Sequence, residues 1–247
     1  MKTLGIDIGT HSITGCIIDC ESGKIVSEIY KVPVETSLTP PTAISKFHGL
    51  LRHFKWNKGI IGISIPEVIR NGTVCSSNVM DMLWLEVNAE QLFMEIADSP
   101  IHIIKTMDAI GTAETYFGAA STQYGTVIFL EVYKNLRSSV FFDKKLMPNI
   151  ELGYLVLGSK TAKGLLKTKM VDGEPVKKKK PFKRTEFVLQ HLEEIFHPDL
   201  FVIGNEMSTK LGKYSRLLDI RTAYTDSKIK NYPANIGAAT AAWLRFR

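Results

Sequence analysis

An aspartate and several small polar residues stand between two apolar runs near the start of the chain. Asp7 closes the first run, Gly9 and Thr10 form the bend, and Ser12 leads into a second run whose strand is expected to begin at Gly15. This pattern predicts a β-hairpin. Its backbone N–H groups and small hydroxyls can cradle a phosphate, and the aspartate can hold hydrated Mg²⁺ beside it. An ordinary first hairpin of a sheet fits the same letters, because glycine-containing turns are common.

A second candidate for chemistry is a lysine-rich region. The net charge is +6, and much of it comes from residues 160–184, which include the consecutive residues Lys177, Lys178, Lys179 and Lys180. Such a run is either a solvated loop or a surface that binds phosphate polymers, nucleic acid or acidic lipid. No aromatic residues interleave with these lysines, as they usually do in single-strand binders. We therefore favour the solvated loop over the polyanion-binding surface.

The composition limits the class of protein. The chain has 247 residues, of which 45% are hydrophobic and 23% charged, typical of a globular protein with one large domain or two modest ones. No apolar stretch approaches the roughly 18 residues of a membrane helix, and the N-terminus runs directly into a predicted strand rather than a signal peptide. Cys16, Cys20 and Cys75 form no CxxC pair, which favours a reduced, cytoplasmic protein and suggests no zinc site.

The elements that would position these residues repeat in two halves. The first half predicts a strand-like run at 25–34, a helix at 42–54 capped by Thr42, a strand at 59–66, a tight turn within 69–74, a helix at 89–97, a strand at 101–104 and a helix at 107–118. The second half predicts strands at 125–132 and 138–142 around a polar turn, a short strand within 147–157, a helix at 185–196, a strand at 200–203 and a closing helix at 238–245. This echo favours two α/β lobes that face each other across a cleft.

Taken together, collinear segments along nearly the whole chain resemble the ROK-type sugar kinases of the actin-like ATPase superfamily, and most closely the polyphosphate glucokinases. They lie at residues 5–9, 66–84, 108–114, 149–153, 197–204 and 233–239. The resemblance implies a two-lobed actin-like (ribonuclease H-like) α/β fold of the ROK type. It places an N-terminal lobe at 1–108 and a C-terminal lobe at 109–233, with a closing helix at 234–247 that packs back on the first lobe.

The chemistry of that family needs a carboxylate that takes the proton from the 6-hydroxyl of the sugar. The family has Asn-Asp-Ala-Asp or Asn-Asp-Ala-Asn at the end of a strand, and the first aspartate is the base. Residues 105–108 are Lys-Thr-Met-Asp, so Thr106 stands at the position of the base. In an extended segment Asp108 would share a side with Thr106 at a distance of roughly 6–7 Å, or it could cap the following helix.

The second phosphate turn of the family also differs here. Its Gly-Thr-Gly-Ile-Gly corresponds to residues 133–137, which contain no glycine, so side chains stand where backbone must approach a phosphate. Lys134, Asn135 and Arg137 can still attract an anion as point or forked charges. Farther on, the Gly-Gly-Gly of the family reads Gly204, Asn205, Glu206, and the glutamate would repel a polyanionic donor.

On the sugar side the resemblance is mixed. It assigns Asn78 and Glu151 to sugar binding, and Tyr154 takes the place of the histidine in the family's Asn-x-Glu-Leu-Gly-His. For phosphate it assigns Asp7, Gly9, Thr10, Ser12, Lys134, Asn135 and Gly204. A surface carboxylate remains the alternative for Glu151.

Two functions follow from this comparison. We favour a catalytically impaired member with a binding or regulatory role, because the base and the second glycine-rich turn are missing. The alternative is an active polyphosphate- or ATP-dependent glucokinase that phosphorylates glucose at its 6-hydroxyl and uses Mg²⁺ with its donor. No other cofactor is expected, and no metal site beyond a possible one at Asp7. The expected partners are glucose or a related sugar, polyphosphate or another polyanion at the lysine run, and a second copy in a homodimer; no membrane is expected.

Overall fold

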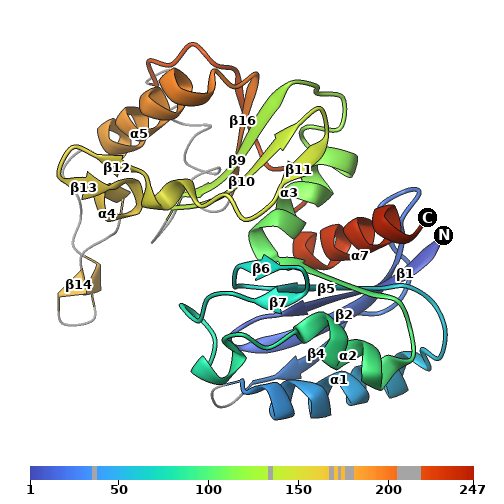
Figure 1. Ribbon diagram of the computed structural model, residues 1–247. Coiled ribbons are helices and arrows are strands. Elements are labelled where there is room, and N and C mark those ends of the chain that lie inside the picture. Colours follow the sequence, from blue (N-terminus) through green and yellow to red (C-terminus); the bar gives the residue numbers. More distant parts are fainter. Residues whose placement is uncertain (35–37, 133–135, 167–169, 172–173, 176–180, 205–217) are drawn as a thin grey trace. The chain divides into compact units, whose positions relative to one another are not determined.

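The computed structural model describes residues 1–34, 38–132, 136–166, 170–171, 174–175, 181–204 and 218–247 (Figure 1). The chain divides into two compact units. The first comprises Met1–Phe117 with Ile229–Arg247, and the second comprises Gly118–Lys228. Our sequence-based boundary between residues 108 and 109 falls inside one helix, α3 (Thr106–Phe117), all of which lies in the first unit.

The first unit is built on a mixed β-sheet with the strand order β3-β2-β1-β5-β8, in which β4 also pairs with β2. Its strands are β1 (Lys2–Ile8), β2 (Ser12–Asp19), β3 (Lys24–Ile25), β4 (Tyr30–Pro33), β5 (Ile61–Ile65) and β8 (Ile101–Lys105). The second strand begins at Ser12 rather than at Gly15, because the hairpin is tight and its ladder already pairs Ile8 with Ile13. β1, β5 and β8 run parallel, whereas β1 and β2 are antiparallel.

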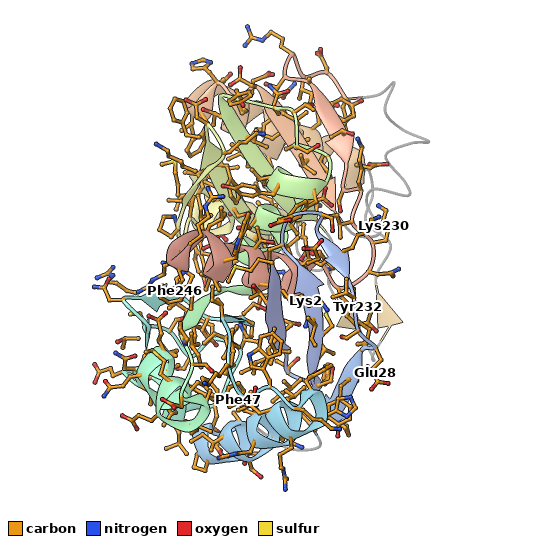
Figure 2. All side chains as sticks on the ribbon, turned by 90° about the vertical axis from the view of Figure 1, so that its right-hand side faces the viewer. Lys2, Glu28, Phe47, Lys230, Tyr232 and Phe246 are labelled. Carbon is orange, nitrogen blue, oxygen red and sulfur yellow. The ribbon has the colours of Figure 1, made fainter. Side chains whose placement is uncertain are left out.

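Helices cover both faces of this sheet (Figure 1). The helices α1 (Pro40–Phe54) and α2 (Ala89–Ala97) lie on one face, and α3 and α7 (Pro233–Phe246) lie on the other. The core under α1 and α2 is aromatic: Phe47, which Figure 2 labels on α1, packs edge-on against Phe93 of α2. A small hairpin of β6 (Ile69–Arg70) and β7 (Thr73–Val74) and the short helix η1 (Met82–Trp84) complete this unit.

The start of α1 corrects one sequence-based prediction. The residue before the helix is Thr39, whose side chain accepts a hydrogen bond from the backbone N–H of Thr42, so Thr39 rather than Thr42 is the N-cap. Pro40 and Pro41 follow as the first helical residues. Proline fits there because the first helical N–H groups have no intrahelical acceptor. Pro40 and Pro41 therefore belong to the first turn of α1, which begins two residues before the predicted start at 42.

The second unit has a mixed sheet with the strand order β11-β10-β9-β16-β17. Its elements are β9 (Thr126–Val132), β10 (Leu136–Phe142), β11 (Lys145–Met147), η2 (Leu152–Tyr154), β12 (Val156–Leu157), β13 (Lys160–Thr161), α4 (Ala162–Leu166), β14 (Met170–Val171), β15 (Glu174–Pro175), α5 (Pro181–Phe196), β16 (Leu200–Gly204) and β17 (Tyr224–Asp226). β9 runs antiparallel to β10 and parallel to β16. The lysine run at 177–180 lies outside the described residues.

The C-terminal helix α7 closes the first unit by direct backbone contact. A Cβ atom on Gly62 would lie 2.0 Å from the carbonyl oxygen of Ala238, and one on Gly237 would lie 1.7 Å from that of Ala109. Only glycine permits such an approach. Because Pro233 suits the first helical position, α7 begins five residues before the predicted closing helix at 238–245 and extends over these contacts.

Asn235 fixes α7 on the first hairpin. The side chain is 1% exposed, and its Nδ2 donates to the carbonyl oxygens of Gly5 at 3.1 Å and Thr14 at 3.0 Å. Its Oδ1 accepts a hydrogen bond from the Thr14 hydroxyl at 3.1 Å. One buried amide thus satisfies polar groups on both strands of the hairpin. Removal of that amide would leave them without a partner.

We predict that Asn235→Ala lowers the free energy of unfolding by about 2–4 kcal/mol, because three buried hydrogen bonds are lost and their partners remain desolvated. Urea denaturation followed by circular dichroism measures this change. Asn231→Ala, an exposed position on the same segment, is the matched control and should change stability by less than about 0.5 kcal/mol. Equal effects of the two substitutions would contradict the role of Asn235.

Candidate functional site

The carboxyl ends of three parallel strands bring most of the predicted site residues of the first unit to one edge of its sheet. The hairpin turn follows β1, Pro66 and Glu67 follow β5, and Thr106 follows β8. In open α/β sheets ligands bind at this edge of the strands. Each of these segments directly follows its strand in the sequence. Because β1, β5 and β8 run parallel, the segments must therefore lie together at one edge of the sheet.

The first hairpin carries Asp7 at this edge. Asp7 and Ser64 are register partners on β1 and β5, and the buried Ser64 hydroxyl donates to Asp7 Oδ1 at 2.6 Å. The bend is closed by a hydrogen bond from the Gly9 N–H to the carbonyl oxygen of Ser12 at 3.0 Å. Thr10 is exposed. The structure thus brings Asp7, Gly9 and Ser12 to one end of the hairpin, and their roles toward phosphate or Mg²⁺ remain predictions.

The junction of β8 and α3 differs from the expected extended segment. α3 begins at Thr106, so Thr106 and Asp108 lie about 200° apart around a helix axis rather than on one side of a strand. The prediction that Asp108 shares a side with Thr106 is therefore wrong. Asp108 is also not the residue that precedes the helix; it lies in the first turn, where a carboxylate interacts favourably with the helix dipole.

Asp108 is instead part of a buried ion pair. Its Oδ1 lies 3.5 Å from Nζ of Lys105, and the two side chains are 2% and 4% exposed. Thr106 carries a buried hydroxyl oxygen that makes no hydrogen bond within the described residues. A buried hydroxyl thus follows β8 at the position that the resemblance assigns to the base, while the carboxylate of Asp108 on α3 pairs with a buried ammonium.

In the second unit, the resemblance assigns the family's second phosphate loop to residues 133–137, between β9 and β10. Residues 133–135, which include Lys134 and Asn135, lie outside the described residues. Arg137 of β10 forms an ion pair with its register partner Glu131 of β9. The expected attraction of a bare Arg137 guanidinium for an anion is therefore reduced, because a carboxylate already compensates that charge.

Gly204 ends β16, beside Glu131 of β9. A Cβ atom at Gly204 would lie 3.5 Å from Cγ of Glu131, an ordinary contact, so packing does not require glycine at this position. Asn205 and Glu206 lie outside the described residues. Among the described residues, no group of three or more His, Cys, Asp or Glu side chains could hold a metal ion.

The predicted sugar residue Asn78 lies in a loop that a buried carboxylate organises. Glu67, at the end of β5, is 2% exposed and accepts hydrogen bonds from the backbone N–H groups of Asn78, Val79 and Met80. The side chain of Asn78 is exposed at the surface of this loop. Sequence reasoning missed Glu67. The available signal was a glutamate directly after a largely apolar strand that ends at a proline, where a carboxylate must find donors.

The predicted sugar residue Glu151 is held by a comparable arrangement in the second unit. The fully buried Ser138 hydroxyl donates to the carbonyl oxygen of Ile150 at 2.9 Å and accepts from the Leu152 N–H at 2.8 Å. A Cβ atom on Gly153 would lie 2.5 Å from the carbonyl oxygen of Leu136, so η2 rests directly on β10. Glu151 is thus fixed through the residues on either side of it.

Tyr154 is half exposed, and Nζ of Lys163 lies 3.3 Å from the centroid of its ring. This cation–π contact covers one face of the ring. Tyr154 therefore lies at the surface of η2, with the positive charge of Lys163 against one face of its ring.

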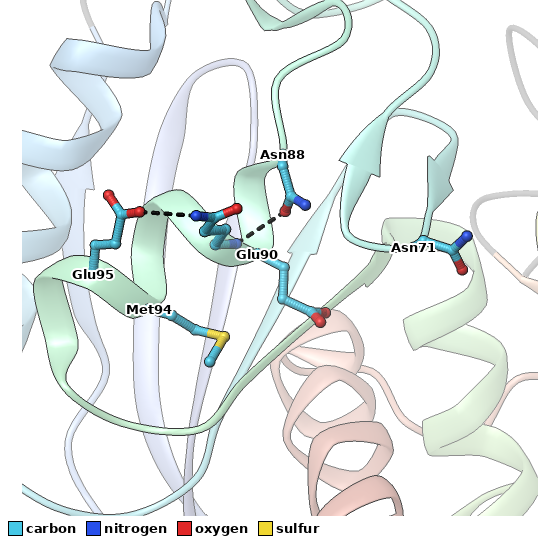
Figure 3. A pocket seen from close by; sticks show the side chains of 6 residues that line it. Asn71, Asn88, Glu90, Met94 and Glu95 are labelled. Carbon is cyan, nitrogen blue, oxygen red and sulfur yellow. Dashed lines mark hydrogen bonds between the residues drawn. The ribbon is translucent and has the colours of Figure 1, made fainter.

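An open pocket on the first unit contains none of the predicted site residues (Figure 3). Its lining comes from α2 and the neighbouring turns and consists of Asn71, Asn88, Glu90, Gln91, Met94 and Glu95. Glu90 is engaged in packing α2 against β8 and α7: its two carboxylate oxygens lie 3.3 and 3.2 Å from the guanidinium of Arg245, and one of them accepts the backbone N–H of Ile103 at 3.1 Å. This glutamate therefore has a structural role.

The electrostatics of Glu90 are set by opposing effects. Desolvation by burial is the largest and would raise the pKa of the carboxyl group. Contacts with His102, the N–H of Ile103 and the charge of Arg245 together outweigh it and lower the pKa of Glu90. A carboxyl group with a lowered pKa in the folded state stabilises the protein above its unfolded pKa and loses that contribution as the pH falls.

Known proteins with similar sequences and structures match nearly the whole chain. The chain is 29% identical over 239 residues to the polyphosphate glucokinase of Mycobacterium tuberculosis, which covers 96% of this chain and 90% of that protein. It matches the inorganic polyphosphate/ATP-glucomannokinase of an Arthrobacter species with a TM-score of 0.83 at 26% identity, over 99% of both chains. No protein-family model matches the chain.

A more distant structure shows the same fold. The ROK family glucokinase of Streptomyces griseus, solved in complex with glucose and AMPPNP, matches 99% of this chain and 100% of its own with a TM-score of 0.74 at 16% identity. The protein is thus an α/β protein with the actin-like ATPase fold of the ROK sugar kinases, as the sequence predicts. Among the proteins of this fold, polyphosphate glucokinases and a polyphosphate/ATP-glucomannokinase are its homologues.

Two further features bear on the sequence-based expectations. No helix of the described part has the length and apolar character to cross a bilayer. Cys16, Cys20 and Cys75 are free thiols, and burial raises the pKa of Cys16 to about 12. The Cys16 thiol is therefore protonated and unreactive at neutral pH.

We predict that Ser138→Ala lowers the free energy of unfolding by about 1–3 kcal/mol, because the carbonyl of Ile150 and the N–H of Leu152 lose their shared partner. Ser139→Ala is the matched control. Ser139 is equally buried, but its hydroxyl makes no hydrogen bond within the described residues, so this substitution should be neutral or slightly stabilising. Chemical denaturation measures both changes. Indistinguishable effects would show that Ser138 does not hold the Glu151 segment.

We also predict that the melting temperature of Glu90→Gln falls less steeply with decreasing pH than that of the unmodified protein. The contribution of Glu90 is fully present above the ordinary pKa of 4.5 and is lost as the pH falls through the lowered pKa of the folded state, so the variant lacks this part of the decline. Melting temperatures recorded between about pH 6 and pH 3 measure it. Glu95→Gln, an exposed position on the same helix, should follow the unmodified protein; parallel curves for all three proteins would refute the prediction.

Proposed function

We propose that this protein is a ROK-type homologue of polyphosphate glucokinases that binds a hexose and is impaired in phosphoryl transfer. Its role is then that of a binding or regulatory protein. The observation that carries the proposal is the buried Lys105–Asp108 pair at the start of α3, with Thr106 at the position of the base. A threonine hydroxyl does not accept a proton at neutral pH, and a buried carboxylate paired with an ammonium is a poor base.

The energetic consequence is large. Loss of a positioned general base alone typically costs about 10²–10⁴ in rate. The Glu131–Arg137 pair and the absence of glycine from residues 133–137 add a second deficit on the donor side. A phosphoryl donor is held chiefly by backbone N–H groups and compensating cations, so a loop without glycine is a poor cradle.

The sugar side supports retained binding. Asn78 and Glu151 are proposed as the sugar-binding residues, and each lies in a segment that buried hydrogen bonds hold in place. Tyr154 is proposed to contact the sugar in the place of the family's histidine, with Lys163 beside its ring. The homologues are named for glucose and mannose substrates, which makes a hexose the ligand class we propose.

Several finer parts of the proposal rest on the resemblance and on charge. Asp7, Gly9, Thr10 and Ser12 are proposed to retain part of a phosphate site, with Mg²⁺ near Asp7 if a donor binds. For Lys177 to Lys180 the solvated loop remains the favoured reading, and attraction of polyphosphate or another polyanion is the alternative. A homodimer and a cytoplasmic location complete the proposal.

The second candidate is an active glucokinase. It is favoured by the similarity to enzymes over 96% of the chain and by the intact Asp7–Ser64 contact on the first hairpin. This reading requires a base other than the residue at position 106. Asp108 can serve only if its pairing with Lys105 breaks.

A coupled assay separates the two candidates. With glucose, Mg²⁺ and either polyphosphate or ATP, we expect no glucose 6-phosphate above a blank at high protein concentration, consistent with a loss of at least about 10²-fold from the missing base. Production of glucose 6-phosphate that Asp108→Asn abolishes would support the active enzyme, provided that circular dichroism shows the variant to be folded. Glu86→Gln, at an exposed position, is the control variant.

Calorimetry on the same preparation tests the binding half of the proposal. Titration with glucose should give a saturable heat, whereas titration with polyphosphate reports the donor side separately. Absence of binding to glucose, mannose and their N-acetylated relatives would refute the proposed hexose binding.

A further inference from the structure

Glu67 has a hydrogen-bonding pattern that the sequence resemblance does not assign. Its Oε1 accepts the backbone N–H groups of Val79 at 2.6 Å and Met80 at 2.8 Å. Its Oε2 accepts the N–H of Asn78 at 3.1 Å and the hydroxyl of Ser76. Three consecutive backbone donors therefore converge on one carboxylate that is 2% exposed.

Successive N–H groups that converge in this way form a concave nest that binds anions. In this chain the anion is supplied internally, by a side chain at the end of β5. Ser76 strengthens the arrangement because its hydroxyl donates to Glu67 and accepts the N–H of Val68 at 3.0 Å. The carboxylate is buried at little cost, since charge-assisted hydrogen bonds replace its water.

The segment that follows is held at its other end as well. Asp81 accepts the N–H of Leu83 at 2.9 Å, and the indole N–H of Trp84 donates to the carbonyl oxygen of Leu38 at 2.7 Å. Trp84 is fully buried, whereas Val79, Met82 and Leu83 are more than half exposed. A loop with so much exposed apolar surface gains little from packing, so its conformation depends on the anchors at Glu67 and Trp84.

We propose that Glu67 is a positioning residue: a built-in anion that fixes residues 76–80 and so presents the side chain of Asn78 to the ligand. The inference rests on the hexose binding proposed above, because Asn78 matters only if a ligand meets it. Glu67 does not touch that ligand. It lies beneath the loop, and its effect on affinity is transmitted through the backbone N–H of Asn78.

The test combines amide hydrogen exchange with hexose calorimetry. In Glu67→Gln we expect exchange at residues 78–80 to rise at least about tenfold, because an amide has only one acceptor oxygen and turns a donor toward the nest. In Glu67→Asp, which retains the charge, exchange should be intermediate. Glu86→Gln, on the same segment but exposed, is the matched control and should leave exchange unchanged.

A double-mutant cycle tests whether Glu67 acts through Asn78. Glu67→Gln should weaken hexose binding about tenfold in the unmodified background and less than about twofold in the Asn78→Ala background. An equal loss in both backgrounds would overturn the positioning role, as would unchanged exchange at residues 78–80. If the unmodified protein binds no hexose, the proposed function fails while the exchange experiment still decides whether Glu67 holds the segment. If Glu67→Gln does not fold, Glu67→Asp carries both measurements.

Discussion

The contact between α7 and the first sheet is the constraint on which the first unit depends. A helix from the far end of the chain lies on the sheet at backbone distance, since Gly62 and Gly237 have no side chains at the points of contact. Asn235 then joins the helix to β1 and β2 through hydrogen bonds that no solvent can replace. The sheet on which α7 packs contains the parallel strands β1, β5 and β8, and their carboxyl ends carry the hairpin turn, Glu67 and Thr106. Most candidate site residues of the first unit thus lie at the ends of strands that α7 covers, on the face of the sheet opposite to α1 and α2.

Much of this fold could be predicted from the sequence because the local signals were strong. The turn at Asn71 and Gly72 has positive φ at both residues, as the Asn-Gly pair indicates, and α2 has the predicted bounds of 89 and 97. Errors arose where two local rules competed. Thr39 and Thr42 both suit an N-cap, and only the placement of Pro40 and Pro41 in the first turn decides between them. The local pattern placed the start of the closing helix at 238, after Gly237, whereas the resemblance placed it at 234, within one residue of the observed start at Pro233.

The sequence allowed us to propose which residues form the candidate site, but not which contacts those residues make. The resemblance located Thr106 correctly as the residue after β8, yet the environment of Asp108 depended on whether that junction was extended or helical. The pairing of Lys105 with Asp108 arises where β8 ends and α3 begins, because the first turn of the helix brings Asp108 back toward the last residue of the strand. Glu67 and Ser138 were missed for a different reason. The sequence marks Glu67 as a carboxylate that needs donors, but neither its partners nor those of Ser138, which lie 9 to 14 residues further along the chain, follow from a local pattern.

The division of the chain has a consequence for how the protein is made. The first unit is assembled from Met1–Phe117 and Ile229–Arg247, and the whole second unit is synthesised in between. At the roughly 5–20 residues per second of translation, the face of β1 and β5 that receives α7 waits for several seconds without its cover. During that interval the surface that Gly5 and Gly62 leave open for the backbone of α7 has no helix packed on it. The second unit, whose chain is continuous, is free to fold first.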